Sequence, residues 1–189
     1  MRSYLLVGLG NVGAEYARTR HNIGFEVLDA LLEREGAGTS FVTQRYAQVA
    51  ECRVKNVRLV LIKPTTLMNL SGQAVNYWLQ AEKIPLSQLL VVVDDVALPL
   101  GTLRLKNKGS DGGHNGLKDI QRRLGRQDYA RLRFGIGQDY PKGRQIDYVL
   151  SRWTRQQEAA LPPRIEAAAE ACKSFALAGP QRTMNQFNG

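Results

Sequence analysis

The sequence V-G-L-G-N-V-G-A-E-Y-A-R-T-R-H-N-I-G, at residues 7–24, contains the turn around which the fold is organised. A short apolar run, Tyr4 to Val7, leads directly into glycines at positions 8, 10 and 13. This pattern is typical of a buried strand that ends in a turn with unusual dihedrals or a close approach to a ligand. One of only two histidines, His21, follows ten residues after Asn11.

The three glycines also match the dinucleotide-binding fingerprint, which requires a helix to begin at the third glycine. Here Gly13 is followed by a polar, Arg-rich run without an apolar face, and the convincing helix begins only near Asn22. The next strand-like run, residues 41–54, has no acidic residue at its end to hold a ribose. Nucleotide binding is therefore the weaker interpretation of this turn, and it stays open as an alternative.

The length of 189 residues predicts a single domain, residues 1–189, large enough for a proper core. No apolar run approaches membrane-spanning length, and the N-terminus is too short and too glycine-rich for a secretory signal. We therefore expect a cytoplasmic protein that does not associate with membranes. Both cysteines, Cys52 and Cys172, read as small core residues of a protein in a reducing compartment.

The charge balance is strongly basic, with 26 Lys and Arg against 17 Asp and Glu and a formal net charge of +9. An excess of this size indicates either a polyanionic partner, most simply nucleic acid, or a generally basic surface. Many basic residues cluster along the later part of the chain: Arg104, Lys106, Lys108, Lys118, Arg122, Arg123, Arg126, Arg131, Arg133, Lys142 and Arg144. Their density beside a second glycine-rich segment, residues 109–116, favours phosphate contacts.

Hydrophobic periodicity predicts strands at residues 3–7, 41–53, 57–63, 89–93, 101–106 and 131–136. It predicts helices over residues 22–35 and 155–178, and two more that begin after Ser71 and at about Leu117. Alternating strands and helices with one hairpin indicate an α/β fold with a mixed sheet and helices on both sides.

Three local features refine this picture. The continuous apolar run 89–93 suits the centre of a sheet that is covered on both faces. Ser71 is expected to cap the helix that follows it, because serine is a preferred N-cap residue. The Pro162-Pro163 pair is expected to interrupt the start of the last helix.

In open α/β sheets, ligands gather at the carboxyl ends of strands. The loops that leave such ends, together with the loop at 109–116, are expected to bring polar residues to one cleft: Asn11, Tyr16, His21, Asn69, Asp94, Asp95, His114 and Asn115. His21 is the candidate general base, and Asp94 is the carboxylate that would orient it. The alternatives are a surface histidine and an aspartate that caps a helix or a turn.

Other catalytic classes are less well supported by the sequence. There is no G-x-S-x-G motif and both cysteines read as buried, which disfavours a covalent nucleophile. Two histidines and Asp94 could form a metal site, but no H-E-x-x-H motif or cysteine pair supports it. Direct attack by an activated water, with no metal and no cofactor, is the remaining prediction.

Four segments in this order and spacing resemble the bacterial-type peptidyl-tRNA hydrolase family: G-L-G-N-V-G-A-E-Y-A-R-T-R-H-N-I-G, K-P-T-T-L-M-N-L-S-G, V-V-V-D-D-V-A-L-P-L-G and G-G-H-N-G-L-K-D. The resemblance covers essentially the whole chain. It implies a single α/β domain with a twisted mixed β-sheet sandwiched between α-helices. It also implies a cytoplasmic, monomeric, metal-independent enzyme. Such an enzyme hydrolyses the ester between a peptide and the terminal ribose of tRNA, and so returns tRNA from stalled translation.

The resemblance also implies roles for the residues of the candidate site. His21 would act on water as the catalytic base, with assistance from Asp94. Asn11, Asn69 and Asn115 would position the peptide, the water and the ester carbonyl.

Contacts with tRNA are implied in the same way. Tyr16 lies where the family contacts the tRNA end or the bound ester. Lys106 and Arg133 lie where the family has basic residues that grip the 5′-phosphate region. His114 belongs to the shared motif, but the resemblance assigns it no definite role.

The chain departs from the family pattern at two positions. Val12 replaces the proline that usually follows Asn11, and Val93 replaces a histidine that many members have before the aspartate. Neither change removes a residue with an assigned role. Some plant organelle relatives serve in intron splicing, so an RNA-binding protein without activity is an alternative hypothesis.

Overall fold

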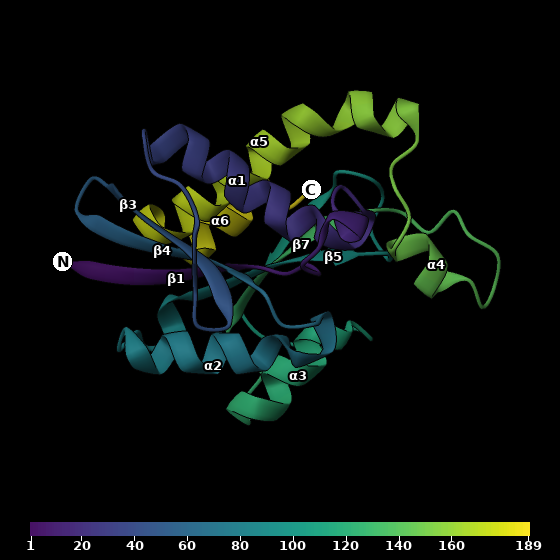
Figure 1. Cartoon of the computed structure of the whole chain (residues 1–189). Coiled ribbons are helices and arrows are strands. Elements are labelled where there is room, and N and C mark those ends of the chain that lie inside the picture. The colour runs from purple at the N-terminus through teal and green to yellow at the C-terminus, as the bar shows by residue number, and fades with distance from the viewer.

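The centre of the protein is a seven-stranded mixed sheet with the strand order β2-β3-β4-β1-β5-β7-β6, as the computed structural model, which describes residues 1–189, shows (Figure 1). The strands are β1 (Arg2–Gly8), β2 (Val42–Gln44), β3 (Ala47–Val54), β4 (Val57–Pro64), β5 (Leu89–Asp95), β6 (Leu103–Lys106) and β7 (Ala130–Gly135). The inner strands β4, β1, β5 and β7 are parallel to one another. β3 and β6 run antiparallel to the neighbours β4 and β7.

Helices cover both faces of this sheet, as predicted (Figure 1). They are α1 (Ile23–Glu35), α2 (Ser71–Ala81), α3 (Asn115–Leu124), α4 (Gln145–Val149), α5 (Arg155–Ala178) and α6 (Pro180–Phe187). In Figure 1, α1, α5 and α6 lie on one face and α2 and α3 on the other. No helix combines the length and the hydropathy that a membrane crossing requires.

The two faces of β1 show why its sequence is apolar without alternation. Tyr4 and Leu6 pack into the core under α1 and α5, whereas Leu5 and Val7 pack into the core under α2 and α3. Successive side chains of a strand point to opposite faces, so burial on both sides requires a continuous apolar run. Full burial of each such side chain contributes about 1.5–3 kcal/mol.

The strand β5 confirms the prediction made for residues 89–93. It pairs in parallel with β1 on one side and with β7 on the other, and all five residues from Leu89 to Val93 have no exposed surface. Its last two residues are Asp94, which is buried, and Asp95, which is partly exposed. The central strand therefore places the buried side chain of Asp94 at the edge of the sheet where the parallel strands end.

Close backbone contact accounts for the glycines of the first turn. A Cβ atom added to Gly8 would lie 2.2 Å from the carbonyl oxygen of Gly24, and one added to Gly24 would lie 2.6 Å from the backbone nitrogen of Leu9. The long helix begins at Ile23, ten residues after Gly13. Gly13 is followed only by a single 3₁₀ turn, Ala14–Tyr16, and not by an α-helix, so the structural context of the dinucleotide fingerprint is absent.

The predicted strand over residues 41–53 is wrong in one respect. It is broken into β2 and β3, which pair antiparallel across a turn at Arg45 and Tyr46. Tyr46 has a φ of 64°, and the Trp78 indole nitrogen donates a hydrogen bond of 2.8 Å to the carbonyl oxygen of Arg45. The turn is thus held by a contact with α2 that no local pattern could indicate. The predicted hairpin between β3 and β4 is confirmed.

Two predictions at helix ends are also corrected. Ser71 is the first residue of α2 rather than its cap, and its hydroxyl donates to the carbonyl oxygen of Met68 at 2.7 Å. α5 continues through Pro162 and Pro163 without interruption. Both prolines are exposed, so water can satisfy the carbonyl groups that lose an intrahelical partner. A further helix, α6, follows Gly179 and was not predicted.

Candidate active site

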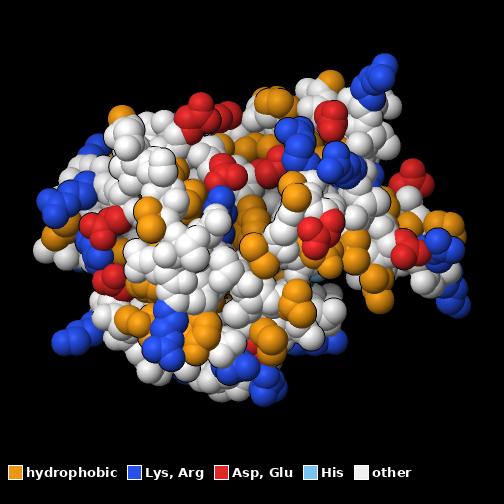
Figure 2. All heavy atoms as spheres, viewed as in Figure 1, with side chains coloured by type: hydrophobic (Ala, Val, Ile, Leu, Met, Phe, Trp, Pro, Cys, Tyr) orange, Lys and Arg blue, Asp and Glu red, His pale blue; other side chains and the backbone are white.

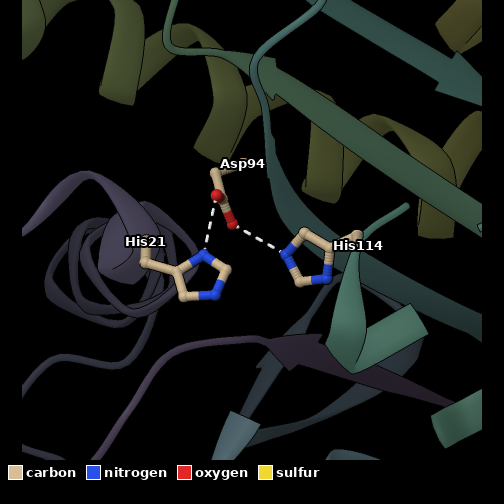
Figure 3. Close-up of side chains that lie close together, drawn as sticks. All are labelled: His21, Asp94 and His114. Atoms are coloured by element: carbon tan, nitrogen blue, oxygen red, sulfur yellow. Dashed lines mark hydrogen bonds and ion pairs between the residues drawn. The ribbon is translucent and has the colours of Figure 1, made fainter. Parts of the chain in front are cut away.

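Three side chains meet at the carboxyl edge of the sheet. The carboxylate of Asp94 lies between the imidazoles of His21 and His114, which come from separate segments (Figure 3). The His21 Nδ1 atom lies 2.8 Å from Asp94 Oδ2, and the His114 Nε2 atom lies 2.8 Å from Asp94 Oδ1. The structure therefore brings the predicted base and the predicted carboxylate together, and adds His114 as a second partner of the same carboxylate.

Each of these side chains is positioned by a different kind of element. His21 lies in a single 3₁₀ turn, Arg20–Asn22, directly before α1. Asp94 is held in β5, between two hydrogen-bonded strands. His114 is the N-cap of α3, and its Nδ1 accepts hydrogen bonds from the backbone N–H groups of Gly116 and Leu117. A strand, a turn and a helix end thus converge on one carboxylate.

This hydrogen bonding fixes the protons on both imidazoles. The His114 Nδ1 atom accepts backbone N–H groups, so it carries no proton, and the proton on Nε2 is donated to Asp94. An ionised Asp94 can only accept, so the His21 Nδ1 carries the proton of their hydrogen bond. The Nε2 atom of His21 is then unprotonated in the neutral ring, which is the form that a general base requires.

The two histidines favour the ionised form of the Asp94 carboxyl group. Burial raises the pKa of Asp94, but the two imidazoles outweigh burial and hold the pKa of that carboxyl well below its usual range. Burial lowers the pKa of His21, but the negative charge of Asp94 and its hydrogen bond raise it, and the net result lies above the ordinary value. Asp94 therefore stabilises the protonated imidazole that proton abstraction would produce.

The side chain of Asn11 is fixed by a second network. Its Oδ1 accepts the backbone N–H of Met68 at 2.9 Å, and the Asn22 side chain bonds both the N–H and the C=O of Asn11. Because Met68 N–H can only donate, the oxygen of the Asn11 amide must face it, and the NH₂ group is left to donate elsewhere. Asn22 was not singled out in the sequence, although it follows His21 directly.

A small pocket surrounds the histidine cluster. It is lined by His21, Asp94, Asp95, His114, Asn115 and Arg133, together with residues of the loop 112–113 and of α4. Three of the predicted cleft residues lie elsewhere. Asn11 lines a separate pocket, and Asn69 is exposed on the turn Met68–Leu70. Tyr16 is partly exposed on the turn Ala14–Tyr16.

The basic residues are placed very differently from one another. Lys106 is exposed on the edge strand β6, opposite Arg131 near the start of β7. Arg133 lines the histidine pocket but is 9% exposed, donates to the carbonyl oxygen of Ser110 at 3.0 Å and lies 3.7 Å from Asp95 Oδ2. Arg131 is fully buried. Of these residues, only Lys106 has a charge that faces solvent freely.

His21, Asp94 and His114 are also the one group of donors close enough together to hold a metal ion, with ligand atoms within 4.8 Å of one another. Tetrahedral zinc with bonds of about 2.0–2.1 Å would hold its ligand atoms about 3.3 Å apart. Here each imidazole nitrogen lies 2.8 Å from a carboxylate oxygen, which is a hydrogen-bond distance. These three side chains could bind a metal ion only after rearrangement, and their present geometry is that of hydrogen bonds.

Both cysteines are buried and unpaired, as predicted. Burial raises the pKa of the Cys52 thiol to about 11 and that of the Cys172 thiol to about 12. Neither thiol lines the histidine pocket. A thiol with a raised pKa is a poor nucleophile, so neither cysteine offers covalent chemistry at this site.

Comparisons with known proteins identify the family of the chain and agree with its fold. A family model described as peptidyl-tRNA hydrolase matches residues 5–189. A peptidyl-tRNA hydrolase of Porphyromonas gingivalis is 59% identical over 185 residues, which cover 98% of this chain and 99% of that protein. One of Parabacteroides distasonis is 58% identical, with 98% of each chain covered. The crystal structure of peptidyl-tRNA hydrolase from Acinetobacter baumannii has a TM-score of 0.91 at 32% identity, covering 98% of this chain and 94% of that one.

Proposed function

The chain belongs to the peptidyl-tRNA hydrolase family, and on that premise we propose that it cleaves the ester between peptide and tRNA with a water molecule activated by His21. One observation carries the mechanism. The Nδ1 atom of His21 is committed to Asp94 at 2.8 Å, which leaves Nε2 as the basic atom. The fixed tautomer and the raised pKa of His21 both support a role in proton transfer.

In this mechanism a water molecule gives a proton to His21 Nε2 while its oxygen bonds to the ester carbon. The negative charge that develops on the carbonyl oxygen needs donors, and the Asn11 NH₂ group is a candidate, because the Met68 N–H occupies the oxygen of that amide and leaves the NH₂ group free to donate. The bond between the ester carbon and the ribose oxygen then breaks. The proton on His21 passes to that ribose oxygen, so a free peptide acid and a free tRNA hydroxyl result.

The asparagines supply selectivity for peptidyl over aminoacyl esters. Asn11, Asn69 and Asn115 offer donors and acceptors that match the first peptide bond of the substrate. An aminoacyl ester has a charged amino group in that place and would lose these contacts. A site that is built for a hydrogen-bonding group rejects a substrate that lacks it, by a large factor.

Recognition of tRNA rests on the excess of positive charge. The net charge of +9 favours phosphate contacts, and the exposed Lys106 is available for one. Arg133 would contribute to tRNA binding indirectly, because its guanidinium donates to the Ser110 carbonyl oxygen and so positions the loop 109–116. Tyr16, partly exposed near the first turn, would contact the tRNA end or the bound ester.

We also propose that the protein acts as a monomer, in the cytoplasm and without a metal. His21, Asp94 and His114 all come from one chain, which supports action as a monomer. Two unpaired, buried cysteines support a reducing compartment such as the cytoplasm. The hydrogen-bonded donor set supports chemistry without a metal or another cofactor.

The test is the release of tRNA from N-acetylaminoacyl-tRNA, with EDTA present, by the wild type, His21→Ala and His21→Gln. Glutamine is the matched variant, because its amide can still donate to Asp94 but has no basic nitrogen. We expect wild-type cleavage and a loss of about 10²–10⁴-fold in both variants, the usual contribution of a general base. Activity close to that of the wild type in either variant would contradict the role of His21, and loss of wild-type activity with EDTA would contradict a metal-free reaction.

The same experiment separates the rival function. An RNA-binding protein without activity would bind tRNA in a salt-dependent manner, and His21→Ala would not change its affinity. If the wild type binds tRNA but releases none, this rival replaces the esterase.

A further inference from the structure

The carboxylate of Asp119 is buried between α3 and the start of α2, and the mechanism above gives it no role. Asp119 is the last residue of the segment G-G-H-N-G-L-K-D, residues 112–119, and its side chain is 3% exposed. Its Oδ2 atom accepts the backbone N–H of Gly72 at 2.8 Å. Burial of a carboxylate is costly unless the group is paired and hydrogen-bonded, so its position needs a reason.

Asp119 supplies the cap that α2 otherwise lacks. The helix begins at Ser71, and its N-cap position is occupied by Leu70, whose side chain cannot accept a hydrogen bond. The first N–H groups of a helix have no partner within the helix, and the positive end of the helix dipole favours a negative charge there. The Asp119 carboxylate meets both needs from a neighbouring helix, because it accepts the Gly72 N–H and places its charge at the start of α2.

Two arginines and a glycine make this contact possible. Arg122 and Arg123, one turn further along α3, pair with the Asp119 carboxylate at 2.6 Å and 3.1 Å. Basic side chains also border the lower part of the molecule in Figure 2, where Figure 1 shows α2 and α3. A Cβ atom added to Gly72 would lie 2.5 Å from the Asp119 carbonyl oxygen, so glycine is required for the two helices to approach this closely.

A short series of hydrogen bonds leads from this contact to the asparagines of the site. The hydroxyl of Ser71, the first residue of α2, donates to the carbonyl oxygen of Met68 at 2.7 Å. The N–H of Met68 donates to Oδ1 of Asn11 at 2.9 Å. Asn69 follows Met68 in the same 3₁₀ turn, which leads into α2 without a break. The positions of both asparagines therefore depend on where α2 begins.

We propose that Asp119 is a positioning residue for substrate selectivity. By fixing the start of α2, its carboxylate keeps Asn69 and the N–H group that orients Asn11 where they meet the first peptide bond of the substrate. This inference rests on the proposed function, which gives the asparagines their role in selecting peptidyl over aminoacyl esters. Asp119 acts through these residues rather than on the substrate, because its side chain is buried between two helices.

The experiment measures selectivity as the ratio of kcat/KM for N-acetylaminoacyl-tRNA to kcat/KM for aminoacyl-tRNA, with the same tRNA and amino acid. Asp119→Ala removes the acceptor, whereas Asp119→Asn keeps a carbonyl oxygen that can accept the Gly72 N–H. We expect the ratio to fall on the order of tenfold in Asp119→Ala, as for loss of one hydrogen bond to the substrate, and to stay close to the wild-type ratio in Asp119→Asn. An unchanged ratio in Asp119→Ala would overturn the proposal, and so would equal ratios in the two variants.

Thr183→Val is the control for a loss of stability alone. Thr183 is fully buried in α6, on the opposite face of the sheet (Figure 1). Its hydroxyl lies 2.9 Å from the Gly179 carbonyl oxygen and 2.7 Å from Ser174 Oγ. Valine has nearly the same shape but no hydroxyl, so this variant should lose stability and keep the wild-type ratio. A ratio that falls equally in Thr183→Val and Asp119→Ala would overturn the proposal, because lower stability would then account for the change.

Ser71→Ala tests the next step of the same series, and it keeps the proposal testable if Asp119→Ala does not fold. Alanine removes the hydrogen bond to the Met68 carbonyl oxygen and leaves the contact between Asp119 and Gly72 in place. We expect the selectivity ratio to fall in this variant as well. A wild-type ratio in Ser71→Ala would contradict the transmission from α2 to the asparagines.

Hydrogen exchange of backbone amides gives a measurement that does not depend on turnover. The N–H groups of Gly72 and Met68 should exchange faster in Asp119→Ala than in Thr183→Val, because only the former variant frees the start of α2. Equally slow exchange of the Met68 N–H in both variants would overturn the proposal. If the wild type cleaves neither ester, or cleaves both equally well, the proposed function fails, and the exchange rates still decide whether Asp119 holds the turn.

Discussion

The guanidinium of Arg20 lies over the ring of Tyr148, with its central carbon 4.2 Å from the ring centroid. The same group donates to the Arg152 carbonyl oxygen at 2.8 Å and to Gln157 Oε1 at 2.7 Å. Arg20 directly precedes His21 and is 4% exposed. The turn that carries the candidate base is therefore fastened to the segment between α4 and α5, more than a hundred residues later in the chain.

Replacement of Arg20 by lysine should lower both stability and turnover. Lysine cannot reproduce a planar fork that donates in several directions while it stacks on an aromatic ring. With net values of about 0.5–1.5 kcal/mol for each hydrogen bond, we expect a loss of about 2–4 kcal/mol in the free energy of unfolding. Denaturant unfolding and kcat at a permissive temperature measure the two effects.

Arg126→Lys is the matched control, because that arginine forms an exposed pair with Asp128. Such pairs contribute about 0–1 kcal/mol, so this variant should behave like the wild type. Equal stability of Arg20→Lys and Arg126→Lys would show that the Arg20 contacts contribute little.

The activity of Asp94→Asn should fall and its pH dependence should shift. His21 must be neutral to accept a proton, so activity is lost as pH falls through the pKa of His21. Asp94 raises that pKa, and asparagine lacks the charge. The acidic limb of kcat/KM should therefore move to lower pH, while the maximum falls by about 10²–10⁴-fold. An acidic limb that stays in place would mean that it reports a group other than His21.

The same pair predicts a dependence of stability on pH. The pKa of His21 is raised in the folded state, so its stabilising contribution is fully present below the unfolded pKa, about 6.5, and is lost as pH rises through the folded value. In wild type, unfolding by denaturant should show this loss near and above neutral pH. In Asp94→Asn this part of the dependence should disappear.

Asn11→Asp and Asn69→Ala should separate structural from functional roles of the asparagines. Aspartate at position 11 keeps an oxygen for the Met68 N–H but lacks the NH₂ donor. We expect near wild-type stability and a loss of about 10²–10³-fold in kcat, as for removal of an oxyanion donor. Asn69 is exposed, so alanine there should change stability by less than about 0.5 kcal/mol and still weaken activity. Full activity in both variants would contradict amide recognition of the substrate.

Lys106→Ala and Arg131→Met should act on different properties, although both remove one positive charge. Lys106 is exposed, so its loss should weaken tRNA binding and reduce the slope of log K against log salt by about one. Arg131 is buried and donates to carbonyl oxygens of Gly109 at 2.9 Å and Tyr129 at 3.1 Å. Its loss should cost about 1–3 kcal/mol of stability, because buried carbonyl oxygens are left without a donor, and should not change the salt slope. A reduced slope in Arg131→Met would mean that this side chain reaches phosphate.

The sequence by itself predicted most of the strands and helices and the mixed nature of the sheet, but not the break between β2 and β3 or the last helix, α6. The continuous apolar run 89–93 could only suit a strand buried on both faces, and the structure has it between β1 and β7. The turn after β1 and the pairing of a histidine with Asp94 were also predictable. Both follow from local chemistry and from the rule that parallel strands present their carboxyl ends at one edge.

Only the tertiary structure decided the other polar contacts around the site. His114 forms a hydrogen bond with the same carboxylate as His21, and the Asn22 side chain donates to the backbone of Asn11. The buried Arg131 guanidinium donates to backbone carbonyl groups inside the protein. Hydrophobic periodicity reports which face of an element is buried, but it carries no information on which distant side chain completes a hydrogen bond. Those partners are chosen by the packing of segments far apart in the chain, since each buried polar group must find one there.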